Sequence, residues 1–267
     1  MKKFKIAAAI ALALIAAIVA FMYFRPASQA PAPTDKKSQL KAEIRKVIAG
    51  RQGAKSAEPK KAKKKRTMLP EAYQKYSADD RKLSHAVQDA LDEEDFAGVQ
   101  QAAELALKSD NPDVRRDAVD ALSWFGADAL PELTVLMSDP DEEVAEAALG
   151  GWEQGLAQID ESSDRLRLSF LAMSALNDAN QLDTIGTHFS GAATEYIDEP
   201  DDDKTQNQRR VEVVQSLAEM ILEGNANAST TGKELYEEIT GNKWISLEEA
   251  EKYVANPDKY EPPDDDD

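Results

Sequence analysis

A 30-residue repeat constrains the fold of this chain more than any other feature. The offset relates the set Val114, Ala118, Ala121 and Leu122 to the set Val144, Ala148, Gly151 and Trp152. Within each set the residues fall at i, i+4, i+7 and i+8, which is one face of an α-helix. The small residues among them let neighbouring helices approach closely. The sequence therefore predicts a stacked helical repeat protein, an architecture that binds partners more often than it catalyses reactions.

The residues between these two helices supply the turns that such a repeat needs. Gly126 is placed to end the first helix in a left-handed cap. A short second helix is expected to carry Pro131 near its first turn and to stop at the turn Asp139-Pro140. The predicted unit is thus one long helix, one short helix and a tight turn.

The segment from Asp110 to Gly151 resembles HEAT repeats of the short bacterial type, with a period of about 30 residues. The resemblance rests on Pro112-Asp113-Val114-Arg115, the break at Gly126, Leu130-Pro131-Glu132-Leu133 and Asp139-Pro140-Asp141. It implies an all-α, HEAT-like α-solenoid whose groove binds a protein or peptide. It also implies an internal role for Arg115, bonded to turn carboxylates or carbonyls between repeats. Ala145 departs from the pattern, because an arginine like Arg115 is usual there.

Looser copies of the pattern extend the predicted array over residues 71–224. No segment of it combines strict alternation with β-branched enrichment, so we expect helices only. Ser77 and Asp95 are predicted to cap the amino-terminal ends of two of them.

The less repetitive residues 225–260 are predicted to form a helical carboxyl-terminal cap. One helix is expected to end at Gly241, and a last helix runs from Ser246 to Val254. The pattern Ser246-Leu-Glu-Glu249 is a capping box that favours this start. Residues 261–267 are expected to form a disordered acidic tail.

Residues 1–25 are predicted to be a signal anchor. Ile6 to Phe24 is an uncharged run of 19 residues behind three lysines, and as a helix it reaches about 28 Å, close to the hydrocarbon thickness of a bilayer. A cleaved signal peptide is the alternative, although its apolar region usually has only about 7–15 residues. The lysines favour a cytoplasmic amino terminus. We therefore expect a single transmembrane helix in an inner membrane with a periplasmic domain; secretion after cleavage and a cytoplasmic domain are the alternatives.

Residues 26–70 are predicted to be a disordered linker, rich first in Pro and Ala and then in basic residues. Gln39 to Ile48 can make a short amphipathic helix through Leu40, Ile44, Val47 and Ile48. Lys55 to Arg66 has nothing to bury. The candidate residues for binding anionic lipid headgroups or another polyanion are Lys60, Lys61, Lys63, Lys64, Lys65 and Arg66. A solvated tether is the alternative for this basic arm.

Charge is segregated along the chain, whose total is −18. After Arg66 there are 15 Lys and Arg against 47 Asp and Glu. Because a phosphate backbone needs a positive surface, this excess of acidic residues argues against nucleic-acid binding by the folded part. A basic partner, a cation or simple solubility fits it better.

No catalytic, cofactor-binding or metal-binding residues are predicted. The chain has no cysteine, and His85 and His188 are far apart, so we expect both histidines to be structural. Asp198 to Lys204 is rich in carboxylates but lacks the residue order of a calcium-binding hand, which favours a solvated loop.

Trp124 and Arg116 are the candidate partner-binding residues. Trp124 falls to the side of its helix's apolar face, whereas Trp152 and Trp244 are expected in the core. Arg116 is available to an acidic partner.

These features favour a non-enzymatic, membrane-anchored scaffold or adaptor that uses its helical array for protein binding. One alternative is an accessory subunit or lyase-like enzyme, as in HEAT-like proteins that attach chromophores, although no nucleophile or acid/base group is visible. Another is an electrostatic tether that acts through the basic linker.

Overall fold

The computed structural model describes residues 36–50, 76–93, 95–201, 203–255 and 257. Apart from Lys36, these belong to the second of two compact units, Lys37–Asp267. The predicted anchor at residues 1–25, the predicted tail at 261–267 and the basic arm from Lys55 to Arg66 lie outside the described residues. Among the helices that are described, none is long and apolar enough to cross a membrane.

The described residues form eleven α-helices and one short 3₁₀ helix, without a strand. In chain order they are α2 (Lys36–Gly50), α4 (Ala78–Asp92), α5 (Phe96–Ala106), α6 (Pro112–Ser123), η1 (Gly126–Ala129), α7 (Leu130–Leu136), α8 (Glu142–Leu156), α9 (Ser162–Ala175), α10 (Ala179–Asp198), α11 (Asp203–Glu223), α12 (Ala226–Thr240) and α13 (Leu247–Ala255). The predicted all-α repeat architecture is confirmed for this part of the chain.

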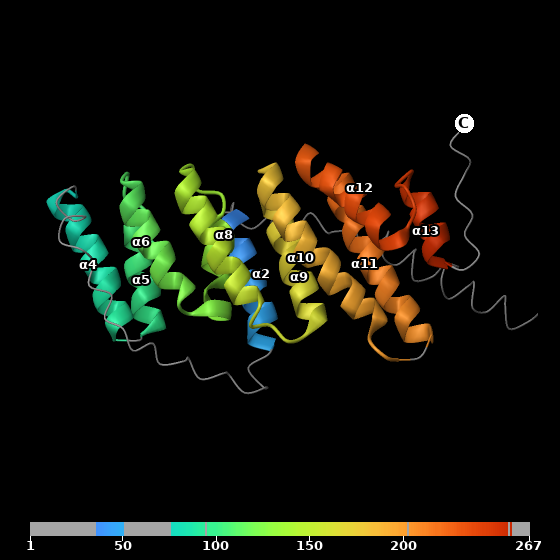
Figure 1. The fold of residues 1–267 in the computed structure, drawn as a ribbon, viewed down its shortest axis with the longest axis horizontal. Coiled ribbons are helices and arrows are strands. Elements are labelled where there is room, and N and C mark those ends of the chain that lie inside the picture. Colours follow the sequence, from blue (N-terminus) through green and yellow to red (C-terminus); the bar gives the residue numbers. More distant parts are fainter. Residues whose placement is uncertain (1–35, 51–75, 94, 202, 256, 258–267) are drawn as a thin grey trace, which may run out of the picture. The chain divides into compact units, whose positions relative to one another are not determined.

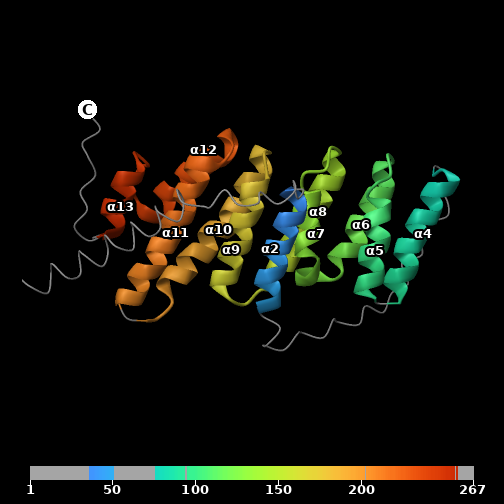
Figure 2. The ribbon, with the colours of Figure 1, turned by 180° about the vertical axis from the view of Figure 1, so that it is seen from behind.

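The helices from α4 to α13 follow one another in a row (Figure 1). Packing between alternate helices defines two layers: α4, α6 and α8, and then α10 and α12, adjoin in one layer, while α7 adjoins α9 and α11 adjoins α13 in the other. The second layer lies on the side that Figure 2 shows. The buried apolar side chains of both layers form one hydrophobic cluster.

Local sequence signals set the helix boundaries. Ser77 caps α4 and Asp95 caps α5, each by accepting a hydrogen bond from a backbone N–H in the first turn, as predicted. Gly241 ends α12 with φ of 71° and Ser246 accepts from the backbone N–H of Glu249 at the start of α13. These cap predictions are confirmed.

Gly126 has the predicted positive φ, 54°, but it does not cap α6. The helix ends at Ser123 with Trp124 as its C-cap, and Gly126 instead opens η1. The extra turn continues directly into the short helix α7. The left-handed conformation of Gly126 therefore serves the turn between α6 and α7. A Cβ at this position would also collide with the side chain of Gln158.

The repeated apolar face is fully buried. Val114, Ala118 and Leu122 of α6 and their counterparts Val144, Ala148 and Trp152 of α8 have no exposed surface. Small residues on α8 permit this packing: a Cβ at Gly155 would lie 2.8 Å from the carbonyl oxygen of Gly126. The small residues of the repeat pattern thus indicate where successive repeats pack closely.

Residues 36–50 correct one prediction. They were expected within a disordered linker, yet they form α2, in which Ile44, Val47 and Ile48 are buried in the common core. The amphipathic helix predicted for Gln39 to Ile48 is confirmed; disorder was the wrong expectation because its apolar side chains have a surface to pack on. In both views α2 lies between α8 and α9, on the side where α7 is (Figures 1 and 2).

Replacing Gly155 by alanine is expected to lower the free energy of unfolding by about 1–3 kcal/mol, because a backbone oxygen blocks the added Cβ. Gly150→Ala is the matched control on the same helix, since its Cβ would meet no atom within 4 Å. Alanine there should raise stability by roughly 0.5–1 kcal/mol through helix propensity. Urea unfolding followed by circular dichroism measures both changes. Equal effects of the two substitutions would contradict the close packing of α8.

Candidate functional site

Arg115 fastens the junction between the two clearest repeats. Its Nε and Nη2 donate to the two carboxylate oxygens of Asp139 at 3.0 and 2.9 Å, and its Nη1 donates to the carbonyl of Ser109 at 2.9 Å. The residue is only 9% exposed, and its hydrogen bonds to the Asp139 carboxylate raise the pKa of its guanidinium. This two-pronged arrangement fixes the orientation of one repeat against the next. The internal role expected of Arg115 is confirmed.

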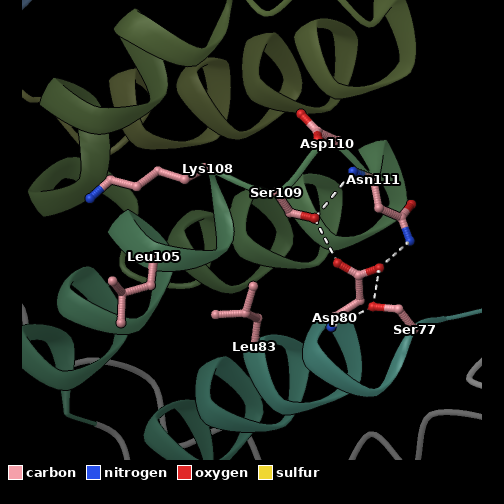
Figure 3. A pocket seen from close by; sticks show the side chains of 8 residues that line it. All are labelled: Ser77, Asp80, Leu83, Leu105, Lys108, Ser109, Asp110 and Asn111. Carbon is pink, nitrogen blue, oxygen red and sulfur yellow. Dashed lines mark hydrogen bonds between the residues drawn. The ribbon is translucent and has the colours of Figure 1, made fainter.

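A shallow cavity of about 540 Å³ opens at the amino-terminal ends of α4 and α6 (Figure 3). Its central group is Asp80, which accepts hydrogen bonds from Ser109 Oγ at 2.7 Å, Ser77 Oγ at 2.9 Å and Asn111 Nδ2 at 3.5 Å. These bonds, that from Ser109 first, hold the pKa of Asp80 below its usual value. Lys108 points away from the carboxylate (Figure 3). Asp80 therefore links α4 to the turn before α6, and its hydrogen bonds stabilise the fold.

Asp117 makes a similar contact in the middle of the same helices. Ser84 Oγ donates to its Oδ2 at 2.7 Å and Tyr76 Oη at 3.3 Å. Burial outweighs these bonds and raises the pKa of Asp117. The carboxylates of Asp80 and Asp117 thus both link α4 to the next repeat.

The two candidate partner-binding residues lie apart along α6. Trp124 follows its last residue and is 52% exposed, whereas Arg116 lies in its second turn, about 12 Å away along the axis. Arg116 Nη1 donates to Glu143 Oε2 at 2.8 Å, and both side chains line a second cavity of about 230 Å³ between α6 and α8. The structure does not bring the two candidates into one site.

Of the two tryptophans expected in the core, Trp152 lies there, whereas Trp244 packs against its edge. Trp152 is fully buried, and half-buried Trp244 packs edge-on against Tyr236 with ring centroids 5.2 Å apart. The histidines are separate: His188 Nε2 lies 3.0 Å from Glu153 Oε1, linking α10 to α8, while His85 is exposed on α4.

The acidic stretch after α10 is held partly by Arg209. Its Nη1 donates to the carbonyl of Glu199 at 3.0 Å, and its Nη2 lies 3.2 Å from Asp201 Oδ2. Within the described residues, no group of three or more His, Asp and Glu is arranged to hold a metal ion. The six candidate lipid-binding residues, Lys60 to Arg66, lie outside the described part of the chain.

The most distinctive polar group is Glu132 on α7. It is only 2% exposed, and its Oε1 accepts hydrogen bonds from Arg45 Nη2 at 2.5 Å and Gln100 Nε2 at 2.7 Å. Lys41 Nζ lies 3.9 Å from the same oxygen. The other oxygen, Oε2, is buried and has no hydrogen-bond partner among the described residues. Glu132 is therefore the point at which α2, α5 and α7 meet.

The sequence pattern predicts that Glu132 lies at the start of the short second helix, but it indicates no contact for this residue. Two signals pointed toward α2: an apolar stripe, and the basic pair Lys41 and Arg45 one turn apart on the same helix. Neither signal identifies the acidic residue that the pair meets.

Comparison with known proteins agrees with the repeat geometry. A family model described as HEAT repeats matches residues 99–182, which run from α5 into α10. The resemblance of Asp110 to Gly151 to HEAT repeats is confirmed, and the match extends it in both directions. Neither a curated protein nor a solved structure matches the chain.

Arg115→Ala is expected to lower the free energy of unfolding by about 3–5 kcal/mol, because it leaves the buried carboxylate of Asp139 without its partner. The neighbouring Arg116→Ala is the control: its ion pair with Glu143 is at least half exposed, and its loss should cost under about 1 kcal/mol. Denaturant titrations of the two variants give the comparison. Similar losses from both would show that Arg115 does not hold the junction.

Proposed function

We propose that this protein is a non-enzymatic adaptor that binds a protein partner through its helical array and is held at a membrane by its amino-terminal segment. The observation that carries the proposal is the HEAT-like stack, since HEAT repeats commonly mediate protein–protein interactions. The polar side chains of Arg115, Asp80 and Asp117 are hydrogen-bonded within the fold. Recognition of another protein is the use that this arrangement supports best.

Exposed apolar side chains give the array places to contact a partner. Leu105, Trp124 and Leu222 are each more than half exposed, although large apolar residues are usually buried. Trp124 is the strongest candidate among them, because tryptophan is enriched in the energetically dominant contacts of interfaces. It lies at the end of α6, just before the turn that leads into α7.

The membrane part of the proposal rests on the sequence alone. Ile6 to Phe24 is long enough to span a bilayer as a helix, and three lysines precede it. An anchor in this orientation would place the array on the periplasmic side of an inner membrane. Basic residues from Lys60 to Arg66 would add attraction to anionic headgroups.

A photo-cross-linking residue at position 124 tests partner binding in cells. It should form a discrete adduct with a second protein, whereas the same residue at Lys82, an exposed position on α4, should not. The adduct at position 124 should persist when Lys55 to Arg66 are deleted. Loss of the adduct on this deletion would assign binding to the basic arm, and no adduct in either protein would count against an adaptor.

Fractionation followed by protease treatment tests the anchor. The intact chain should sediment with membranes. Protease that reaches only the periplasmic face of the inner membrane should digest the array. Replacing Leu12 and Leu14 with lysine should release the chain from that fraction, because a charge at the centre of a span costs about 2.5–3.5 kcal/mol. A chain that is soluble before this change, or an array protected from outside, would contradict the anchor or its orientation.

A further inference from the structure

Helix α2 packs on the array but is not one of its repeats. It precedes the stack in sequence, yet its side chains reach Glu132 of α7, 87 positions after Arg45. It buries an apolar stripe of Ile44, Val47 and Ile48 and sets basic groups beside it. We define the α2 site as the surface of the array that α2 covers, with Gln100 and Glu132 at its base. The array thus holds an amphipathic, basic helix.

Glu132 is not fully satisfied by α2. A carboxylate can accept two parallel hydrogen bonds from one guanidinium, as Asp139 does from Arg115. Arg45 reaches only Oε1, and Oε2 remains buried without a partner among the described residues. A buried, unpaired acceptor costs free energy. A helix whose arginine meets both oxygens would therefore bind this site more strongly than α2 does.

A like charge on α2 is a second mismatch. Burial, then the charge of Glu223 and then that of Glu43 raise the pKa of the Glu219 carboxyl group on α11. A nearby negative charge disfavours the ionised form of a carboxyl group. A neutral or basic residue at the position of Glu43 would remove this repulsion.

Most residues of α2 are exposed. Only three of its 15 residues are buried. Its first turn has no acidic residue and starts with Lys36 and Lys37, whose charges oppose the positive end of the helix dipole. Elements with few buried apolar contacts open at low cost relative to the core. Because α2 is not one of the repeats, its departure would leave the packing among the helices from α4 to α13 in place.

Charge complementarity indicates what replaces it. The α2 sequence has five basic residues and one acidic residue, whereas the chain after Arg66 has 47 acidic residues against 15 basic ones. The spacing of the buried side chains, at i, i+3 and i+4 with arginine at i+1, defines the pattern that the site accepts.

From these observations, we infer that the α2 site is the array's partner-binding site, that it takes an amphipathic, basic helix of another protein, and that α2 is an internal ligand which this helix displaces. The inference rests on the proposed function, because it names the partner class for an array that binds protein. α2 would then raise the threshold for binding, since a tethered competitor acts at an effective concentration near the millimolar range.

Binding of a labelled peptide of the sequence Lys36–Gly50 to the full chain tests the inference. The double variant Ile44→Asp, Arg45→Glu, which weakens the internal helix, should bind the peptide at least tenfold more tightly than the wild-type chain does. Lys46→Glu is the matched control, because this residue is exposed on the same helix, and it should bind as the wild type does. A peptide with Glu43→Gln should bind more tightly than the unchanged peptide.

Glu132→Gln in the double variant should reduce peptide binding about tenfold or more. Equal binding by the double variant, the wild type and Lys46→Glu would overturn the inference, as would indifference to the change at Glu132. The inference would also be overturned if the double variant formed a dimer and bound no added peptide. That result would indicate that copies of this chain exchange helices.

A cleavable version of the chain covers the case in which the double variant does not fold. A protease site placed between residues 50 and 76 leaves every described contact of α2 intact. After cleavage, excess peptide should replace α2 within the folded array. An α2 that stays bound until the array unfolds would show that it is a permanent part of the core and would overturn the inference.

The in-cell adduct at position 124 separates this inference from the proposed function. An adduct there without peptide binding would refute the α2 site as the partner site and leave the adaptor function standing. Peptide binding without an adduct at either position would support the site and count against the adaptor function in cells.

Discussion

The close approach of successive repeats is the constraint on which the rest of this structure depends. Glycines on α8 let its backbone come near η1 and α6, with no room for a Cβ at Gly155. That proximity buries the repeated apolar faces and brings the turn containing Asp139 within reach of Arg115. The ion pair is strong because it is withdrawn from water, and it is withdrawn because the helices are close. Packing and electrostatics therefore reinforce each other at this junction.

Features set by neighbouring residues could be predicted from the sequence. The caps at Ser77, Asp95 and Gly241 involve atoms only a few residues apart, so residue type alone identifies them. The 30-residue repeat likewise places apolar residues at matching positions of α6 and α8, and it correctly predicted that Trp152 is buried. The extra turn η1 was missed because Gly126 suits any left-handed position near a helix end.

Contacts between distant segments could not be predicted in the same way. The amphipathic pattern of residues 39–48 indicates a helix, but it does not specify which surface buries that helix. The meeting of Arg45 with Glu132 depends on where the stack exposes a carboxylate, which is a property of the assembled array. Trp124 and Arg116 show the converse: both are exposed residues of one helix region, yet they lie about two turns apart along its axis.

The difference between Arg115 and Ala145 has a mechanical consequence. The junction at Arg115 is clamped by a buried, two-pronged ion pair, whereas the following repeat has alanine at the matching position. There the bridge from α8 to α10 is His188 with Glu153, whose side chains are more than a third exposed. The junction after α8 thus lacks the buried guanidinium that ties the junction before it, so we expect it to be the more flexible of the two. Helix α2 lies over that place (Figure 2), where its contacts would limit bending.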